Sequence, residues 1–359
     1  MTQAADIQHS LSLRETRELM KTRLAGIVPE FEIDMKAEYA FEINQLKRQL
    51  NAVILGHNYM EPALYCSVPD YTGDSLELSR ISTQTDADII VFCGVQFMAE
   101  TAKILNPAKT VLIPSAKAGC SLAAGITAQD VLNLRKRYPG APVVSYVNTY
   151  ASVKAESDYC CTSGNAAKVV EHLMAEGHKQ IIFLPDEYLA HNTAAELKIE
   201  FFRASRVKLG ALEDLDPRKT TMIGWQARCE VHDQFTVGDI ENIRKQFPDV
   251  VILAHPECSP EVIQKCEYAG STKQMIEYVR KTSAPHYVLL TECSMADNIA
   301  AENPEKEMLR LCSIRCPHMN QITLEETLAS LQQLRYKIEL DADLILRARL
   351  PIDRMLEIR

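Results

Sequence analysis

The sequence lacks a surplus of positive charge. Its 39 lysine and arginine residues are outnumbered by 48 aspartate and glutamate residues, which gives a formal net charge of −9 at pH 7. No run of lysine or arginine concentrates the positive charge in one segment. Nucleic acids and anionic membranes attract proteins through such basic clusters, so we expect neither to be a partner.

Long apolar segments are also missing. The uninterrupted apolar stretches, such as IIVFC at 89–93, are far shorter than the ~18 residues that a membrane-spanning helix requires. Residues 1–20 hold no apolar stretch that could act as a signal peptide. We therefore expect a cytoplasmic protein.

The rest of the composition is that of an ordinary globular chain, with 47% hydrophobic and 24% charged residues among 359. It excludes a disordered, coiled-coil or collagen-like protein, and a chain of this length can bury a large core without disulfides. The 11 cysteines are many for a cytoplasmic protein, where disulfides are not the default. Ligation of a metal or a cluster is the interpretation to test.

Short apolar runs rich in β-branched residues alternate with amphipathic segments of helical period. This pattern predicts an α/β fold whose parallel sheets are covered on both faces. The expected strands are 52–56, 88–93, 110–114, 142–147, 180–185, 220–225, 249–254, 286–291 and 308–314, and expected helices include 96–106, 127–138, 165–176 and 236–247. In such sheets the ligand lies beyond the carboxyl ends of the strands.

One pattern occurs three times along the chain. A strand runs into a polar segment, a hydroxyl residue follows at a helix start, and a cysteine comes two strands later. The three copies are His57-Asn58-Tyr59 with Ser75 and Cys120, Asn148-Thr149 with Ser163 and Cys229, and His255-Pro256-Glu257 with Thr272 and Cys316. The spacing from hydroxyl to cysteine is nearly equal in the first and third copies, and the middle copy carries extra residues within 186–219.

Repetition on this scale predicts three similar three-layer α/β units, which we place about a pseudo-threefold axis. The expected units are residues 35–120, 121–229 and 230–316. A polar helical extension, residues 1–34, precedes them. The C-terminal helices, residues 317–359, are expected to pack back on the first unit.

A threefold arrangement would bring Cys120, Cys229 and Cys316 together at its centre. Three thiolates on a [4Fe–4S] cluster leave one iron open, and an open iron is a Lewis acid that can hold a substrate oxygen. Zinc is the competing metal, because thiolates bind zinc equally well. Zinc sites usually draw on local pairs such as C-x-x-C, whereas these cysteines lie far apart in the chain.

From about residue 35 to the C-terminus, the chain resembles the bacterial quinolinate synthases, a family of transferases that make the pyridine precursor of NAD. The resemblance rests on eight motifs in order. They are GHNYM (56–60), GDSLELS (73–79), AGCSLA (118–123), YVNTYASVKAESDYCCTSGNA (146–166), WQARCEVH (225–232), HPEC (255–258), AGSTK (269–273) and CPHMN (316–320).

The resemblance implies a reaction and the residues that perform it. Iminosuccinate and dihydroxyacetone phosphate would condense to quinolinate, phosphate and two waters, with the [4Fe–4S] cluster as a Lewis acid and an aspartate oxidase as a functional partner. The cluster ligands would be Cys120, Cys229 and Cys316, and the proton carriers Tyr59, His232 and Glu257. The substrate pocket would comprise His57, Ser75, Tyr146, Val147, Asn148, Ser163, His255, Pro256, Glu257 and Thr272.

Simpler interpretations exist for many of these side chains. Hydroxyl residues at helix starts are usually N-caps, and the remaining cysteines at 66, 93, 160, 161 and 266 are interpreted as small buried hydrophobes. The histidines at 172, 178, 191 and 286 are interpreted as structural. Cys258 and Cys312 stand beside motifs, and a redox or auxiliary role stays open for both.

Two other functions remain as alternatives. A cluster-binding sensor of dicarboxylates would use the same three cysteines, although the acidic charge and the absence of a DNA-binding helix pair in the pattern disfavour a transcriptional sensor. A zinc-dependent lyase of the aldolase type is the second alternative.

Overall fold

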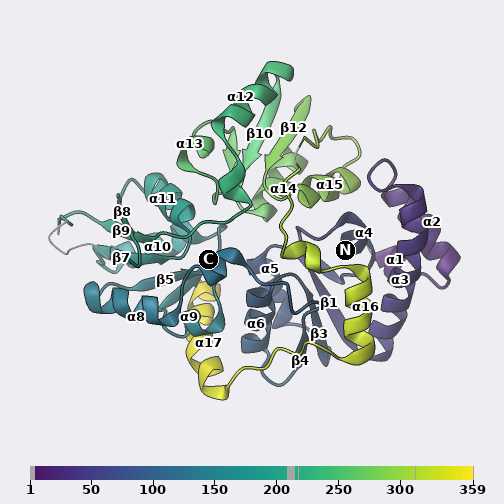
Figure 1. The fold of residues 1–359 in the computed structure, drawn as a ribbon, viewed down its shortest axis with the longest axis horizontal. Helices are drawn as coiled ribbons and strands as arrows, with labels where there is room; N and C mark the ends of the chain where they lie inside the picture. The colour runs from purple at the N-terminus through teal and green to yellow at the C-terminus, as the bar shows by residue number, and fades with distance from the viewer. Residues whose placement is uncertain (1–4, 208–214, 217, 312, 359) are drawn as a thin grey trace.

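Three parallel β-sheets form the framework of the computed structural model, which describes residues 5–207, 215–216, 218–311 and 313–358 (Figure 1). All strand pairs in the sheets are parallel, and helices flank the sheets, which confirms the predicted α/β class. The sheets have the strand orders β2-β1-β3-β4, β6-β5-β7-β9-β8 and β11-β10-β12. In Figure 1 they form three lobes that meet near the middle of the molecule.

The strands span Ala52–His57 (β1), Tyr71–Gly73 (β2), Ile89–Cys93 (β3), Thr110–Leu112 (β4), Val143–Tyr146 (β5), Tyr159–Cys161 (β6), Gln180–Leu184 (β7), Glu200–Ala204 (β8), Thr221–Trp225 (β9), Val250–Ala254 (β10), Tyr268–Ala269 (β11) and His286–Leu290 (β12). The central strands are almost wholly buried, as their continuous apolar sequences require.

The helices span Ala5–Gln8 (α1), Leu13–Arg23 (α2), Glu30–Gln49 (α3), Pro62–Ser67 (α4), Ser75–Ser82 (α5), Gln96–Leu105 (α6), Ser121–Ala124 (α7), Ala128–Arg137 (α8), Ala151–Lys154 (α9), Ala166–Ala175 (α10), Glu187–Glu196 (α11), Val237–Gln246 (α12), Pro260–Ile263 (α13), Thr272–Lys281 (α14), Cys293–Glu302 (α15), Leu324–Gln333 (α16) and Ala342–Glu357 (α17). The four helices expected from periodicity are present as α6, α8, α10 and α12, to within one residue at each end. None of the helices in the described part of the chain is long and apolar enough to cross a membrane.

The strand expected at 308–314 is wrong. Within the described residues of this segment, Met308 forms an isolated β-bridge with Tyr287. The N–H of Tyr287 donates to Glu307 O, and the N–H of Leu309 donates to Tyr287 O. Leu311 is exposed, so the apolar residues beyond the bridge do not continue into the core. The third sheet consequently ends at β12.

The extra residues of the middle unit add a strand at a sheet edge. β8 pairs in parallel with β9 and lies outermost in the order of the second sheet. Residues 208–214 and 217, also within the expected insertion, lie outside the described part of the chain. β8 therefore lies at the edge of the second sheet, away from the ends of its central strands.

The N-terminal helices are part of the core. Ile7, Met20 and Leu24 are fully buried, and α2 packs against α3. The expected boundary at residue 34 falls inside α3, because this helix begins at Glu30. Residues 1–34 are thus polar in overall composition, but their helices bury an apolar face.

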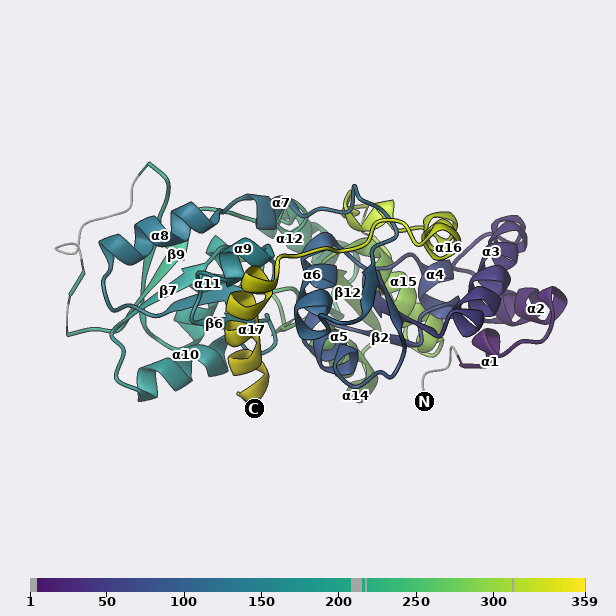
Figure 2. The same cartoon turned by 90° about the horizontal axis from the view of Figure 1, so that it is seen from below.

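The two C-terminal helices pack on different parts of the molecule. α16 lies against α3 and β3 of the first unit, as expected. α17 lies mainly against α9 and β6 of the second unit and also touches α6 (Figure 2). Arg347 pairs with Glu156 at 2.7 Å, and the Arg354 guanidinium lies over the Tyr159 ring at 5.2 Å. α17 thus contacts the first unit through α6, and the second unit through α9 and β6.

Candidate active site

A cavity lies where the carboxyl ends of the three sheets meet. Its empty space, counted together with the open solvent at its mouth, is about 730 Å³. Side chains from all three repeats line it: His57, Tyr59, Asp74, Ser75, Val95, Phe97, Met98, Gly119, Cys120, Ser121, Tyr146, Asn148, Thr162, Ser163, Cys229, Glu230, Val231, His232, His255, Glu257, Thr272, Glu292, Cys316, His318 and Met319. The structure thus brings together most of the residues singled out in the sequence.

Sheet register defines which of these residues are equivalent. Gly56, Ser145 and Ala254 each pair with the last residue of the neighbouring strand, namely Cys93, Leu184 and Leu290. His57, Tyr146 and His255 follow directly and occupy equivalent positions. Two residues further on stand Tyr59, Asn148 and Glu257. The sequence pattern had matched Asn148 with His57. The register instead matches Asn148 with Tyr59, two residues further along the chain.

His57 and His255 make the same backbone contact. The N–H of Tyr59 donates to Nδ1 of His57 at 3.2 Å, and the N–H of Glu257 donates to Nδ1 of His255 at 3.4 Å. Burial lowers the pKa of His57 to about 4 and that of His255 to about 3. Both rings are therefore neutral near pH 7 and carry their proton on Nε2.

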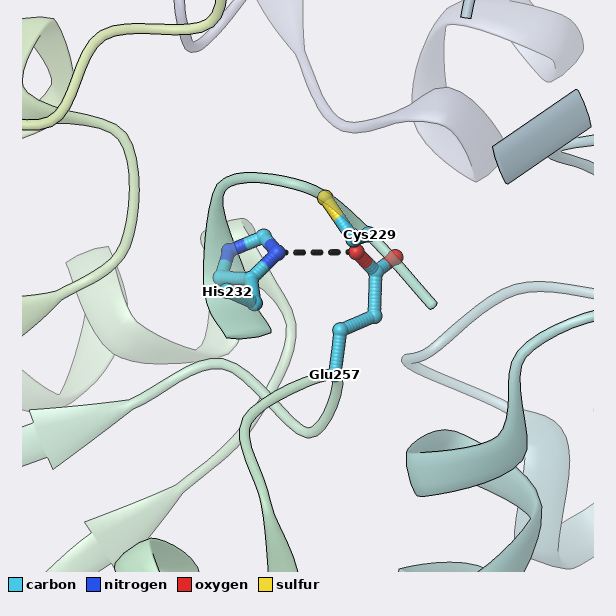
Figure 3. A group of neighbouring side chains, drawn as sticks. All are labelled: Cys229, His232 and Glu257. Atoms are coloured by element: carbon cyan, nitrogen blue, oxygen red, sulfur yellow. Dashed lines mark hydrogen bonds and ion pairs between the residues drawn. The ribbon is translucent and has the colours of Figure 1, made fainter. Parts of the chain in front are cut away.

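Glu257 accepts hydrogen bonds from three side chains of the cavity wall. Its carboxylate accepts from Tyr146 Oη at 2.6 Å, from Asn148 Nδ2 at 3.4 Å and from His232 Nδ1 at 2.8 Å (Figure 3). Burial opposes its ionisation, but the attraction of His255, which is itself protonated at the low pH where Glu257 titrates, and the hydrogen bonds from His232 and Tyr146 lower the pKa of Glu257 to about 2. Glu257 is consequently an anion that holds its neighbours in fixed orientations.

A chain of hydrogen bonds leads away from Glu257. The other ring nitrogen of His232, Nε2, lies 2.9 Å from Thr291 Oγ1, within hydrogen-bond distance. Thr291 Oγ1 in turn lies 2.5 Å from Tyr59 Oη. Burial raises the pKa of Tyr59 well above its ordinary value, so the phenol keeps its proton. Thr291 belongs to none of the sequence motifs or repeats, and only its place directly after β12 could have indicated it.

The helix starts at the cavity are capped by neighbours of the predicted residues. Asp74 caps α5 and accepts from the N–H of Glu77, whereas Ser271 caps α14 in a capping box with Gln274. Ser75 and Thr272 are the first residues of these helices and line the cavity. The simpler interpretation of these two hydroxyls as N-caps is therefore wrong. Their positions place them at the positive ends of the helix dipoles.

Cys120, Cys229 and Cys316 line the same cavity from three separate loops. Burial, together with the negative charges of Glu257 and Cys316, raises the pKa of Cys120 to about 12, and burial raises that of Cys316 to about 11. Glu230 and His318, beside two of the cysteines, lie 3.1 Å apart and join their loops. Buried thiols of this kind are held as thiolates by a bound cation.

A second ligand set overlaps the first. The ligand atoms of Cys229, His232 and Glu257 all lie within 4.8 Å of one another (Figure 3). One thiol, one imidazole and one carboxylate could hold a single divalent ion such as zinc. In this structure, however, His232 and Glu257 are hydrogen-bonded to each other rather than directed at one shared metal position.

Two predicted pocket residues do not line the cavity. The Val147 carbonyl accepts from Lys154 Nζ, and the Val147 N–H donates to Cys161 O. These two backbone hydrogen bonds hold Val147 in the loop after β5. Pro256 faces a separate groove, where its carbonyl accepts from Asn192. Their backbones belong to strand-end loops, but their side chains are not part of the wall.

The residues interpreted as structural lie elsewhere. His172 and His178 approach Glu176, His191 packs on the ring of Phe201 and His286 approaches Glu307. Cys258 is buried, and its thiol donates to Leu290 O. Cys312 lies outside the described residues. Cys293 is disulfide-bonded, which the sequence analysis did not anticipate.

Comparison with known proteins relates the chain to one family. The model of the family described as quinolinate synthetase A protein matches residues 41–357. The chain is 48% identical over 336 residues to quinolinate synthase 2 of Mesorhizobium japonicum, covering 94% of this chain and 96% of the relative. It is 47% identical over 341 residues to quinolinate synthase of Agrobacterium fabrum, with 94% and 90% covered. A quinolinate synthase of Xylella fastidiosa is 47% identical over 329 residues, with 92% and 88% covered. The chain therefore belongs to the quinolinate synthase A family of enzymes.

Proposed function

We propose that this enzyme condenses iminosuccinate with dihydroxyacetone phosphate to give quinolinate, phosphate and two waters in the biosynthesis of NAD. Family membership supports the reaction. The observation that carries the proposal is the cavity itself, in which one cysteine from each repeat faces neutral histidines and an ionised glutamate. An aspartate oxidase would supply iminosuccinate, the oxidation product of aspartate. We place the enzyme in the cytoplasm.

Cys120, Cys229 and Cys316 would hold a [4Fe–4S] cluster. The fit is chemical: three buried thiols from three loops line one cavity, and the equivalent strand ends support our placing the units about a pseudo-threefold axis. Bound there, the cluster would supply an iron without a protein ligand as a Lewis acid.

The walls of the cavity suit a substrate with several negative charges. Iminosuccinate carries two carboxylates and the triose carries a phosphate. Ser75 and Thr272 offer hydroxyls at helix starts, and Ser163 lies close before α10. Neutral His57 and His255 add Nε2–H donors without bringing a charge that pairs with Glu257.

Proton transfer is the task of the hydrogen-bonded chain from Tyr59 to Glu257. Glu257 is ionised and can accept a proton, while Tyr59 and Tyr146 keep theirs and can donate. His232 links the two ends because one ring nitrogen contacts Glu257 and the other Thr291. The condensation and the two dehydrations each need such a transfer.

A zinc-dependent lyase is the second candidate, because Cys229, His232 and Glu257 could hold a divalent ion. It would leave Cys120 and Cys316 without a role in metal binding. Iron, sulfide and zinc analysis of protein purified without oxygen separates the two candidates. A bound zinc with no sulfide would favour the lyase.

The direct test is anaerobic turnover. Iminosuccinate and dihydroxyacetone phosphate should yield quinolinate, and a protein that binds dicarboxylates without forming it would instead be a sensor. Serine substitutions at Cys120, Cys229 and Cys316 should each abolish iron binding, because each unit supplies one ligand. Cys258→Ser and Cys312→Ser should retain most of the iron. If C316S keeps its iron and C312S loses it, the third ligand has been misassigned.

A further inference from the structure

Three side chains outside the cavity wall hold the loops that carry it. Asn298 of α15 donates from Nδ2 to the carbonyls of Asn58 and Met60, at 3.1 and 2.8 Å. These two carbonyls flank Tyr59 on either side. One amide group therefore fixes both peptide groups next to a cavity residue.

The same arrangement recurs at Glu257. Asn192 of α11 donates from Nδ2 to the carbonyls of Pro256 and Cys258, at 2.8 and 2.9 Å. Again the two acceptors are the residues directly before and after the one that faces the cavity. Asn192 lies in the second unit, whereas the loop that it holds belongs to the third.

A lysine performs this task at Asn148. Lys154 of α9 is fully buried, and its Nζ donates to the carbonyls of Val147 and Thr149. The described hydrogen bonds of this ammonium group end on those two backbone carbonyls. All three residues of the equivalent set, Tyr59, Asn148 and Glu257, are thus flanked by two carbonyls held by one donor.

The fold explains why a lysine replaces an asparagine. α6, α11 and α15 follow equivalent strands and have equal lengths, and their sixth residues are Thr101, Asn192 and Asn298. The Thr101 hydroxyl donates to Phe97 O within its own helix. Lys154 supplies the missing donor, and its Nζ lies 5.6 Å from the centre of the Phe97 ring.

We propose that Asn192, Asn298 and Lys154 are positioning residues, which we call the carbonyl clamps, for Glu257, Tyr59 and Asn148. The clamps fix the backbone on both sides of each cavity residue and so the direction of its side chain. The catalytic consequence rests on the proposed function, whereas the ordering of the loops does not. Because Asn192 and Asn298 reach into the next unit, each also ties the cavity to the packing between units.

Amide hydrogen exchange of the protein without added substrate tests the ordering. Asn192→Ala should accelerate exchange at residues 257–258 by at least ~10-fold, Asn298→Ala at 59–60, and Lys154→Met at 147–149, because each loses two hydrogen bonds that order its segment. Each variant should leave the other two segments unchanged. In anaerobic turnover, kcat/KM should fall by roughly 10- to 100-fold, the range expected when a reacting group is misplaced by about 1 Å.

Two buried donors that do not line the cavity provide controls. Asn44 Nδ2 donates to Ser67 O at 2.9 Å, and Lys47 Nζ donates to Val68 O at 2.8 Å and also pairs with Asp70 at 2.9 Å. Asn44→Ala and Lys47→Met should lower thermal stability while exchange in the three loops and kcat/KM stay within about threefold of wild type.

Unchanged exchange in the clamped segment, or equal effects in the controls, would overturn the positioning role. If exchange rises locally but kcat/KM does not change, the clamps order the loops without serving catalysis, and the proposal is also overturned. If the wild-type protein forms no quinolinate while the exchange pattern is as expected, the proposed function fails and the clamps stand.

Discussion

Replacing Glu257 with glutamine keeps the shape of the side chain and removes its charge and one of its two acceptor oxygens. In the structure one carboxylate oxygen accepts from His232 Nδ1 and the other from Tyr146 Oη. The amide of glutamine can accept from one of these groups and must present N–H to the other. If N–H faces His232, the ring must move its proton to Nε2, which reverses the hydrogen-bonded chain to Thr291.

The expected magnitude follows from both effects. Loss of a general base costs about 10²- to 10⁴-fold in rate, so kcat should fall by roughly 10³-fold. Hydrogen bonds to a carboxylate are about twice as strong as neutral ones, and one buried donor is left poorly paired, so the free energy of unfolding should fall by about 1–3 kcal/mol. The cysteines are unchanged, and iron content should match that of the wild type.

Anaerobic quinolinate formation, iron content and denaturant unfolding measure these effects. Glu267→Gln is the matched control, since Glu267 accepts from the N–H of Ile252 in the same unit but does not line the cavity. It should keep turnover within about threefold of wild type. E257Q with near wild-type kcat would refute the role of Glu257 as a base, and E257Q without iron would show that this carboxylate supports metal binding instead.

Three further outcomes are expected. The pKa of His57 is about 4 and that of His255 about 3, against about 6.5 unfolded, so the unfolded chain binds more protons on these two residues between those values. Each histidine should therefore cost the metal-free protein about 2 kcal/mol of stability at pH 5 relative to pH values above 6.5, while Glu292, whose pKa is raised by burial to about 7, acts in the opposite direction; denaturant titrations of the wild type and of His57→Asn at pH 5 and 7 isolate the share of one histidine. A stability difference between wild type and H57N that is the same at both pH values would contradict this. Thr291→Val breaks the hydrogen-bonded link between Tyr59 and His232 and should lower kcat by about 10- to 100-fold at unchanged iron content. An unaffected kcat would exclude proton transfer along the hydrogen-bonded chain from Tyr59 to Glu257. Ser271→Ala removes the cap of α14 and should cost about 1 kcal/mol in thermal unfolding, and no loss would mean that water replaces the cap.

The central strands could be predicted from their continuous apolar runs, and α6, α8, α10 and α12 from their helical period, whereas the five-residue edge strand β8 was not expected. β2, β6 and β11 could not be predicted, since each has only two or three residues and takes its strand conformation from pairing with a central strand. The segment at 308–314 shows the opposite error, because apolar composition alone does not supply a pairing partner.

Much of the candidate site could also be anticipated, because strand ends in parallel sheets are natural places for polar side chains. Thr291 and the clamps were missed, because their roles depend on contacts between units that no local pattern records. Val147 and Pro256 do not line the cavity for a related reason. Neighbours of a cavity residue on a strand-end loop point away from it, and here their carbonyls bond to Lys154 and Asn192.

The wall of the cavity draws on residues spread along the chain from His57 to Met319. During synthesis the first unit can fold as soon as it has emerged, but it then offers only one face of the wall. The wall becomes complete when residue 319 has been added, and α16 and α17 then pack on earlier parts of the chain. A group held by all three cysteines, as we propose, could therefore not find its complete site before nearly the whole chain has been synthesised.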